Sequence, residues 1–341
     1  MKYSIFFFLT SSIALSQGPL NPLGAPAPMM KTLDQIESRT PIAFLPFTIT
    51  TPGSYYFTRN LEFTALTGNS ITIATNNVTL DLNGFTLIST AEVTGNAIQV
   101  DNQGTAGLSN IAIKNGKIAG NTTVTVTENP TNRTWSVSQA GFSTGIKAQG
   151  LSSRNLIVDQ IQVTGCRSIG ISASGGSVIN CPVSSNGSIG INAFEGSVTN
   201  CTASSNGGTG IFSSSVTNCI ARYNSDTGIS SSVVMNCVAS SNGDIGIQAY
   251  RGSVANCMAS SNGGNGIDAD QGSVTNSTTT SNRKNGISAN YGSVTNCTAS
   301  FNNTSSTAGV VDLNATEAVI AFTRFGKGNT TGCTLTGTKS P

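Results

Sequence analysis

The sequence predicts an all-β fold, a parallel β-helix solenoid whose coils span about 18–20 residues. Three observations predict it: a Gly-Ile pair that recurs at a regular period, asparagine and cysteine columns with the same period, and repeats without helix-length apolar patterns. Leucine-rich repeats would need a leucine signature, and helical repeats would need longer amphipathic segments. The Gly-Ile pairs begin at Gly170, Gly190, Gly210, Gly228, Gly246, Gly266 and Gly286.

The repeated columns predict what stacks on what. In a β-helix each coil hydrogen-bonds to the next about 4.8 Å along the axis, so equivalent residues lie above each other. We expect the Ile of Gly-Ile, the Ala two positions later and the Val of Gly-Ser-Val to point inward. Asparagine at a bend tolerates left-handed backbone angles, and stacked asparagines can pass amide hydrogen bonds along a ladder. The first asparagine column is Asn180, Asn200, Asn218, Asn236, Asn256, Asn276 and Asn296, and the second is Asn186, Asn206, Asn224, Asn242, Asn262, Asn282 and Asn302.

Cysteine follows the first asparagine column, and Ser277 fills the one gap. Two interpretations stay open for this column: stacked free thiols, or at least one disulfide between neighbouring coils. Side chains that all point the same way make a bridge awkward. Zinc is disfavoured because its ligands converge rather than form a row, and the chain has no histidine. The column is Cys181, Cys201, Cys219, Cys237, Cys257 and Cys297.

The N-terminus is typical of a secretory signal peptide. Lys2 supplies the positive charge, a short apolar run follows, and Ala14-Leu15-Ser16 forms a small-x-small cleavage site. A buried N-terminal strand is the alternative. No later segment is apolar enough to cross a membrane. We therefore expect a secreted or extracytoplasmic protein without a transmembrane segment in its mature chain.

We predict five segments along the 341 residues. The segment near 121–136 carries the only tryptophan, Trp135, and interrupts the early coils, so we expect a projecting loop that could bind a ligand. The five segments are a signal peptide at 1–17, a Pro-rich leader or linker at 18–40, an N-terminal cap with early irregular β-coils at 41–140, regular β-helix repeats at 141–303 and a C-terminal cap at 304–341.

The low charge content and small net charge of the chain argue against a nucleic-acid partner. Charged residues are only 9% of the chain and the formal net charge is +2. A nucleic-acid-binding domain normally shows a basic patch or stripe. We therefore expect no nucleic-acid partner.

The repeated line "GSVTNCTASSNGGTGI", preceded by "PFTITTPGSYYFTRNL" and "ITIATNNVTLDLNGFTL", resembles the bacterial secreted right-handed parallel β-helix repeat proteins of the pectin-lyase-like superfamily. The resemblance covers the chain from Pro41 onward. It implies a right-handed solenoid. It leaves the activity open, because that superfamily includes lyases, hydrolases, tailspikes and adhesins. Its hydrolases use aspartates with a histidine, and its lyases use carboxylates that hold calcium with an Arg or Lys as base. The chain lacks histidine, so the hydrolase pattern is missing.

Four aspartates are candidate calcium ligands. Asp226 and Asp244 each lie two residues before a Gly-Ile pair, in adjacent coils, and Asp268 and Asp270 follow the next pair. Carboxylates held that close favour a bound cation or a raised pKa. The alternative is that they are solvated turn residues. No other cofactor is expected.

Four side chains are candidate glycan contacts. Phe194 and Tyr250 occupy the same repeat position, and Tyr291 falls one place later. They precede the Gly-Ser-Val turn, so we expect them on one ridge of loops where they could stack on sugar rings. Arg251 could clamp a sugar. The alternatives are local packing over the turn for the aromatics and plain surface charge for Arg251.

We therefore predict a secreted β-helix repeat protein with a structural or glycan-contacting role and no evident catalytic site. Its partner would be an extracellular polysaccharide or a cell-surface component. The alternative is a calcium-dependent polysaccharide lyase or related carbohydrate-active enzyme.

Overall fold

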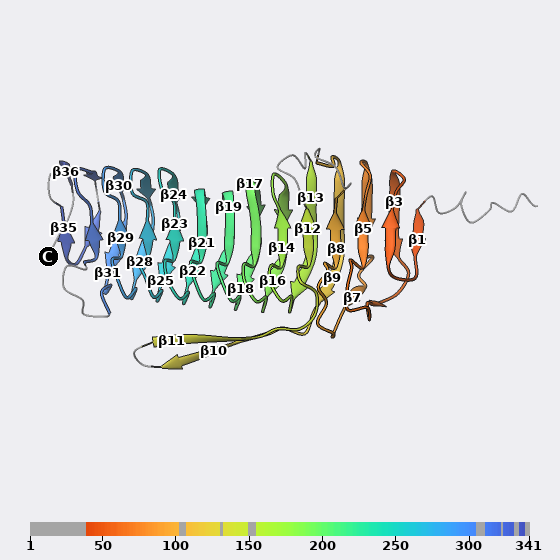
Figure 1. Cartoon of the computed structure of the whole chain (residues 1–341). Helices are drawn as coiled ribbons and strands as arrows, with labels where there is room; N and C mark the ends of the chain where they lie inside the picture. Colours follow the sequence, from red (N-terminus) through yellow and green to blue (C-terminus); the bar gives the residue numbers. More distant parts are fainter. Residues whose placement is uncertain are drawn as a thin grey trace, which may run out of the picture. The chain divides into compact units, whose positions relative to one another are not determined.

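The chain folds as a stack of β-coils, shown in Figure 1. A computed structural model describes residues 39–101, 107–129, 132–148, 155–304, 311–321, 323–330 and 334–337. The regular secondary structure of these residues consists of strands alone, and 34 strands join one hydrogen-bonded network. The all-β prediction is confirmed. The predicted signal peptide and almost all of the predicted leader lie outside the described residues.

Strands before residue 140 form the early coils and a separate hairpin. The early coils contain β1 (Thr40–Ile42), β2 (Phe47–Ile49), β3 (Gly53–Phe57), β4 (Leu61–Glu62), β5 (Ile71–Ile73), β6 (Val78–Asp81), β7 (Thr86–Ile88), β8 (Ile98–Val100) and β9 (Ile111–Ala119). The hairpin contains β10 (Thr123–Asn129) and β11 (Asn132–Ser138).

Regular coils follow, and each offers three strand positions. The first begins at the Ile of Gly-Ile, the second holds the Val of Gly-Ser-Val, and the third follows the cysteine column. The strands up to the middle of the stack are β12 (Ile146–Ala148), β13 (Leu156–Thr164), β14 (Ile171–Ala173), β15 (Ser177–Ile179), β16 (Pro182–Ser184), β17 (Ile191–Thr199), β18 (Thr202–Ser204), β19 (Ile211–Thr217), β20 (Ile220–Arg222), β21 (Ile229–Met235) and β22 (Val238–Ser240). The later strands are β23 (Ile247–Gln248), β24 (Ser253–Ala255), β25 (Met258–Ser260), β26 (Ile267–Asp268), β27 (Ser273–Thr275), β28 (Thr278–Thr280), β29 (Ile287–Ser288), β30 (Ser293–Thr295) and β31 (Thr298–Ser300).

Strands beyond residue 304 continue the stack in parallel register. Leu313 pairs with Ile287, and Ile320 pairs with Val294. The predicted C-terminal cap therefore contains coils that add to the regular repeats. Its described strands are β32 (Leu313–Asn314), β33 (Val319–Ala321), β34 (Arg324–Phe325), β35 (Gly328–Asn329) and β36 (Thr334–Thr336).

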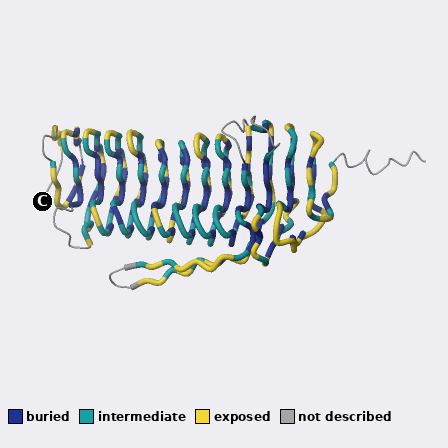
Figure 2. The backbone as a smooth tube through the Cα atoms, in the orientation of Figure 1, coloured by how far each residue is buried: buried dark blue, intermediate teal, exposed yellow. Residues whose placement is uncertain are grey.

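The core is a set of stacked apolar columns. Ile191 pairs with Ile211 in the first strand position, and Val198 pairs with Val216 in the second, always in parallel. The isoleucines, the alanines two positions later and the valines have almost no exposed surface. Figure 2 shows these buried positions repeating from coil to coil. The predicted inward columns are confirmed, and burial of these side chains stabilises each coil against its neighbours.

The first asparagine column lies on the surface at a left-handed bend. The φ of Asn200 is 55° and that of Asn218 is 55°, a conformation that asparagine tolerates well. Six of the seven side chains donate to the coil before them; for example, Asn236 Nδ2 donates to Asn218 Oδ1 at 3.1 Å. The predicted left-handed bend and amide ladder are confirmed for this column.

The second asparagine column forms a buried ladder. Asn206 Nδ2 donates to Asn224 Oδ1 at 2.9 Å, and Asn224 Nδ2 donates to Asn242 Oδ1 at 3.0 Å. The side chains have no exposed surface from Asn186 to Asn282. At this bend the left-handed residue is the one before the asparagine, as at Ser205. The asparagine itself turns inward because its amide serves the ladder rather than the bend.

Cysteines form a buried column of hydrogen-bonded thiols. Cys201 Sγ donates to Thr199 O at 3.2 Å and accepts from the backbone N of Cys181 at 3.3 Å. Ser277 makes the same two contacts through its hydroxyl, with Thr275 O and Cys257 N. All six thiols of the column are free. Of the two interpretations of this column, the stacked free thiols are what the structure contains.

The buried thiols should resist chemical labelling. Burial raises the pKa of Cys297 to about 11 and that of Cys166 to about 12. At these two positions the reactive thiolate is therefore scarce at about pH 8, and along the whole column the apolar core blocks access of a reagent to the sulfur atoms. A Cys333→Ser variant, which removes the cysteine outside the described residues, should react with a thiol reagent only after unfolding in guanidinium. Rapid labelling of the native variant would contradict this expectation.

The segment predicted to be a projecting loop is a hairpin that lies along the coils. β10 and β11 pair antiparallel from Thr123 with Ser138 to Asn129 with Asn132. One face carries the pairs of valine with valine, valine with tryptophan and glutamate with arginine, and the other carries threonine and serine. The prediction of a loop at this place was wrong, because the alternation of valine and threonine in "TVTVT" is a strand pattern.

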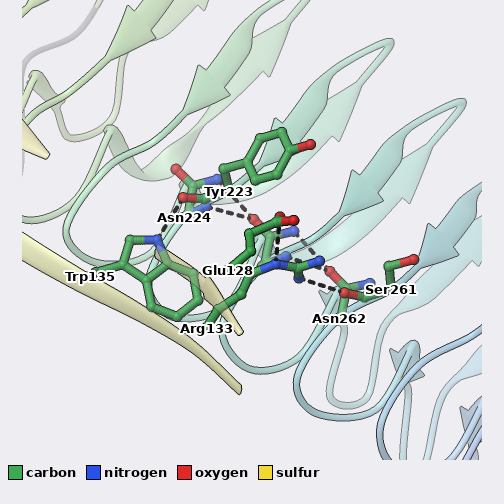
Figure 3. A network of polar contacts seen from close by, with 8 residues as sticks. Glu128, Arg133, Trp135, Tyr223, Asn224, Ser261 and Asn262 are labelled. Atoms are coloured by element: carbon green, nitrogen blue, oxygen red, sulfur yellow. Dashed lines mark hydrogen bonds and ion pairs between the residues drawn. The ribbon is translucent and has the colours of Figure 1, made fainter. Parts of the chain in front are cut away.

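Two side chains of the hairpin bond to the coils, as Figure 3 shows. Trp135 Nε1 donates to Tyr223 O at 2.9 Å, and Arg133 Nη1 donates to Ser261 O at 2.9 Å. Arg133 also pairs with Glu128 at 3.0 Å. A Cβ atom added at Gly243 would lie 2.1 Å from Ser225 O and 2.9 Å from the Trp135 ring, so this glycine permits the close approach of both the preceding coil and the hairpin.

Candidate glycan-binding ridge

Two-residue loops, or in β17 a two-residue bulge of the strand, form a ridge at one corner of the coils. They occur where a 20-residue coil passes from its first to its second strand position, and we call them the loop ridge. Phe194, Tyr250 and Tyr291 lie on it with 42%, 56% and 61% of their surface exposed. The second residue of these loops is left-handed: φ is 56° at Arg251 and 56° at Tyr291. The predicted clustering on one ridge of loops agrees with this placement.

A first hollow of about 560 Å³ lies between two tyrosines of the loop ridge. Asp270 lines this hollow, and its Oδ1 accepts hydrogen bonds from Ser288 Oγ at 3.2 Å and from Asn290 N at 2.9 Å. Amide and hydroxyl side chains supply the rest of the polar lining. The lining residues are Tyr250, Asp270, Gln271, Asn290, Tyr291, Asn314 and Thr316.

Arg251 stands beside this hollow. Its guanidinium lies 5.1 Å from the centroid of the Tyr250 ring, and its Nε donates to Gln271 Oε1 at 2.8 Å. These two contacts orient the arginine along the ridge and position the tyrosine ring. Arg251 is exposed, so it remains able to contact a ligand.

A second hollow of about 230 Å³, which we call the notch, lies between Phe194 and Tyr250. The Phe194 ring stacks on the Phe212 ring, with centroids 6.0 Å apart and planes 11° apart. Phe212 and the polar residues of the notch were not predicted from the sequence. The lining residues are Phe194, Phe212, Ser213, Ser214, Ser230, Ser231, Ser232, Gln248 and Tyr250.

The four candidate calcium ligands lie on neighbouring coils. Asp244 N donates to Asp226 O at 3.3 Å, which confirms that these two residues stack. Asp226 Oδ2 accepts from Thr209 Oγ1, and Asp268 Oδ2 accepts from Asn265 Nδ2. Within the described ranges, no group of three or more Asp, Glu or Cys side chains could hold a metal ion. Calcium binding at these aspartates stays a prediction that titration can test.

Asp268 should make stability depend on pH. Its pKa is raised, first by burial and then by the charges of Asp270 and Asp244. A carboxyl group with a raised folded-state pKa destabilises the fold as pH rises from the unfolded-state pKa through the folded-state value. Asp268→Asn should therefore match the wild type below pH ~4 and be modestly more stable at neutral pH. Urea unfolding at both pH values checks this, and equal stabilities at neutral pH would contradict it.

Comparison with known proteins agrees with the fold. Residues 167–305 match the protein family described as "Right handed beta helix region". The chain therefore has the fold of a right-handed parallel β-helix. The predicted resemblance to pectin-lyase-like β-helix proteins is confirmed at the level of the fold. No curated protein matches this β-helix protein in sequence.

Two solved structures share the architecture. The A-module of the Azotobacter vinelandii mannuronan C-5 epimerase AlgE6 is 14% identical, and the similarity covers 85% of this chain and 91% of that one at a TM-score of 0.52. A mutant of the periplasmic alginate epimerase AlgG is 12% identical, with coverages of 90% and 83% and a TM-score of 0.55. At these identities the similarity shows the fold alone.

Proposed function

We propose that this β-helix protein is a glycan-contacting module that acts outside the cytoplasm. One observation carries the proposal: exposed aromatic rings of the loop ridge flank two hollows whose other lining residues are mostly serines and amides. Apolar ring faces pack against the carbon–hydrogen faces of a sugar, while amide and hydroxyl groups pair with its hydroxyls. The two hollows lie on one ridge and share Tyr250, so several sugars of one chain could bind along it.

Two further observations support the proposal. The two similar solved structures are named as epimerases of mannuronan and alginate, which are polysaccharides, so the same fold serves proteins that handle such chains. The predicted signal peptide supports a place outside the cytoplasm. Among the described residues, no helix is long and apolar enough to span a bilayer.

Binding to a panel of soluble polysaccharides tests the proposal. We expect retardation of the wild type by at least one polysaccharide in affinity electrophoresis. Tyr291→Ala should weaken that binding about tenfold, a loss of ~1.4 kcal/mol, if a stacked ring is removed. Phe301→Ala is the matched control, because Phe301 is 81% exposed but lies at the corner before the second asparagine column rather than on the loop ridge. Absence of binding to every polysaccharide would overturn the proposal.

The same panel distinguishes a lyase. A calcium-dependent lyase would cleave polyuronates and create an unsaturated product that absorbs ultraviolet light. We propose binding without cleavage as the function, so no absorbance should develop with calcium present. If it does develop, Asp226→Asn and Asp244→Asn should be tested next, because those residues are the candidate ligands.

A further inference from the structure

Two neighbouring coils are shorter than the coils on either side. Ile211, Ile229 and Ile247 follow at steps of 18 residues, whereas Ile191 and Ile211 are 20 apart. The missing residues are those of the ridge loop: Ala193 pairs with Ser213, and the next pair is Ser197 with Ser215. β19 and β21 therefore run without the loop, between β17 and β24 (Figure 1). The gap in the loop ridge is the notch.

Serine in a column of alanines closes the two short turns. Ser213 and Ser231 stand where Ala193 and Ala249 stand in the longer coils, and both serines are buried. Ser213 Oγ lies 2.9 Å from Gly196 O and 3.2 Å from Ser215 O, and Ser231 Oγ donates to Val233 O at 3.1 Å. These hydroxyls satisfy carbonyl groups of the tightened turn, so the loopless conformation is built into the sequence.

Walls and floor of the notch differ in chemistry. The stacked rings of Phe194 and Phe212 form one wall, and Tyr250 forms the other. The two flanking loops are three coil steps of about 4.8 Å apart, so their backbones are separated by ~14 Å. Ser214, Ser230, Ser232 and Gln248 line the floor.

The charge of the lining residues and the volume of the notch restrict the class of ligand that it can bind. None of the nine lining residues carries a charged side chain, in contrast to the first hollow with its Asp270. The volume of about 230 Å³ is below the ~300–1,000 Å³ of pockets that enclose drug-sized ligands. We propose that the notch binds one uncharged sugar ring of a polysaccharide, stacked on the Phe194–Phe212 wall with its hydroxyls on the serine and glutamine floor. This inference rests on the proposed function.

Refilling the gap tests the notch directly. The filled variant replaces Ser213–Ser215 and Ser231–Val233 by Ala-Asp-Gln-Gly-Ser, the residues at 269–273, which restores a loop native to another coil. The control carries Ser174→Asp and Gly175→Gln, which build the same loop sequence on a coil that does not line the notch. Ser232→Lys is a second blocking variant at an exposed position, in case the filled variant fails to fold.

The probes are neutral glucans, mannans and galactans on one side and alginate and pectate on the other, measured by affinity electrophoresis and calorimetry. The wild type and the control should bind a neutral glycan equally, and the filled variant and Ser232→Lys should bind it at least ~10-fold more weakly. Undiminished binding by a folded blocking variant would overturn the inference that the notch is the binding site but leave the proposed function standing. Binding of polyuronates alone would overturn the inference that the ligand is uncharged. A wild type that binds no polysaccharide would overturn both the inference and the proposed function.

Discussion

Asn224→Ala is expected to lower the free energy of unfolding by about 3–5 kcal/mol, because each buried group that loses its partner costs ~1–3 kcal/mol. Asn224 Oδ1 accepts from both the N and the Nδ2 of Asn206, at 3.2 Å and 2.9 Å. Its Nδ2 donates to Asn242 Oδ1 at 3.0 Å and to Ala203 O at 3.1 Å. Alanine removes all four contacts in the middle of a fully buried ladder.

Urea unfolding monitored by tryptophan fluorescence measures this loss of stability close to the substituted residue. Trp135 is the only tryptophan of the chain and bonds to Tyr223 O, one residue before Asn224. The matched control is Asn218→Gly on the same coil. It keeps the left-handed φ accessible and removes only exposed contacts, so its loss should stay below ~1 kcal/mol. Similar losses for the two variants would contradict the assignment of the buried ladder.

Gly228→Ala is expected to cost about 3 kcal/mol or more, since overpacking costs ~1–3 kcal/mol and broken hydrogen bonds add to it. A Cβ at Gly228 would lie 2.5 Å from Asn242 Nδ2 and 2.7 Å from Gly246 O. Gly246 O accepts from Ile229 N at 2.9 Å, so the methyl group would disturb both the ladder and the bonds between coils.

Gly208→Ser is the control for the glycine substitution. A Cβ at Gly208 meets its nearest atom at 3.1 Å, and the equivalent position one coil earlier is already occupied by Ser188. Its effect should stay within ~0.5 kcal/mol, as for most surface substitutions. Thermal unfolding of both variants checks the difference. If Gly228→Ala left the stability unchanged, the coils could separate at this corner without loss of stability. That result would contradict the close packing of the Gly-Ile column.

Much of the site could be predicted from the sequence, but not its most specific part. Phe194, Tyr250 and Tyr291 fall at related repeat positions, so their placement on one ridge follows from the period alone. Phe212, Ser230 and Gln248 were missed because outward strand positions in the repeat show no regular residue type. Their signal was the 18-residue spacing of two coils, which becomes a hollow only where longer coils flank it on both sides.

The sequence by itself determined the all-β class, the length of the coils and the stacking of equivalent residues, because a period of 18–20 residues allows each residue only one place in its coil. It did not distinguish the two asparagine columns, which recur equally often; only the tertiary structure decided that Asn206 and Asn224 are buried while Asn200 and Asn218 are exposed. The packing of the hairpin was likewise decided by tertiary structure. Trp135 meets Tyr223 across 88 positions of sequence, and no local pattern specifies a contact between segments so far apart.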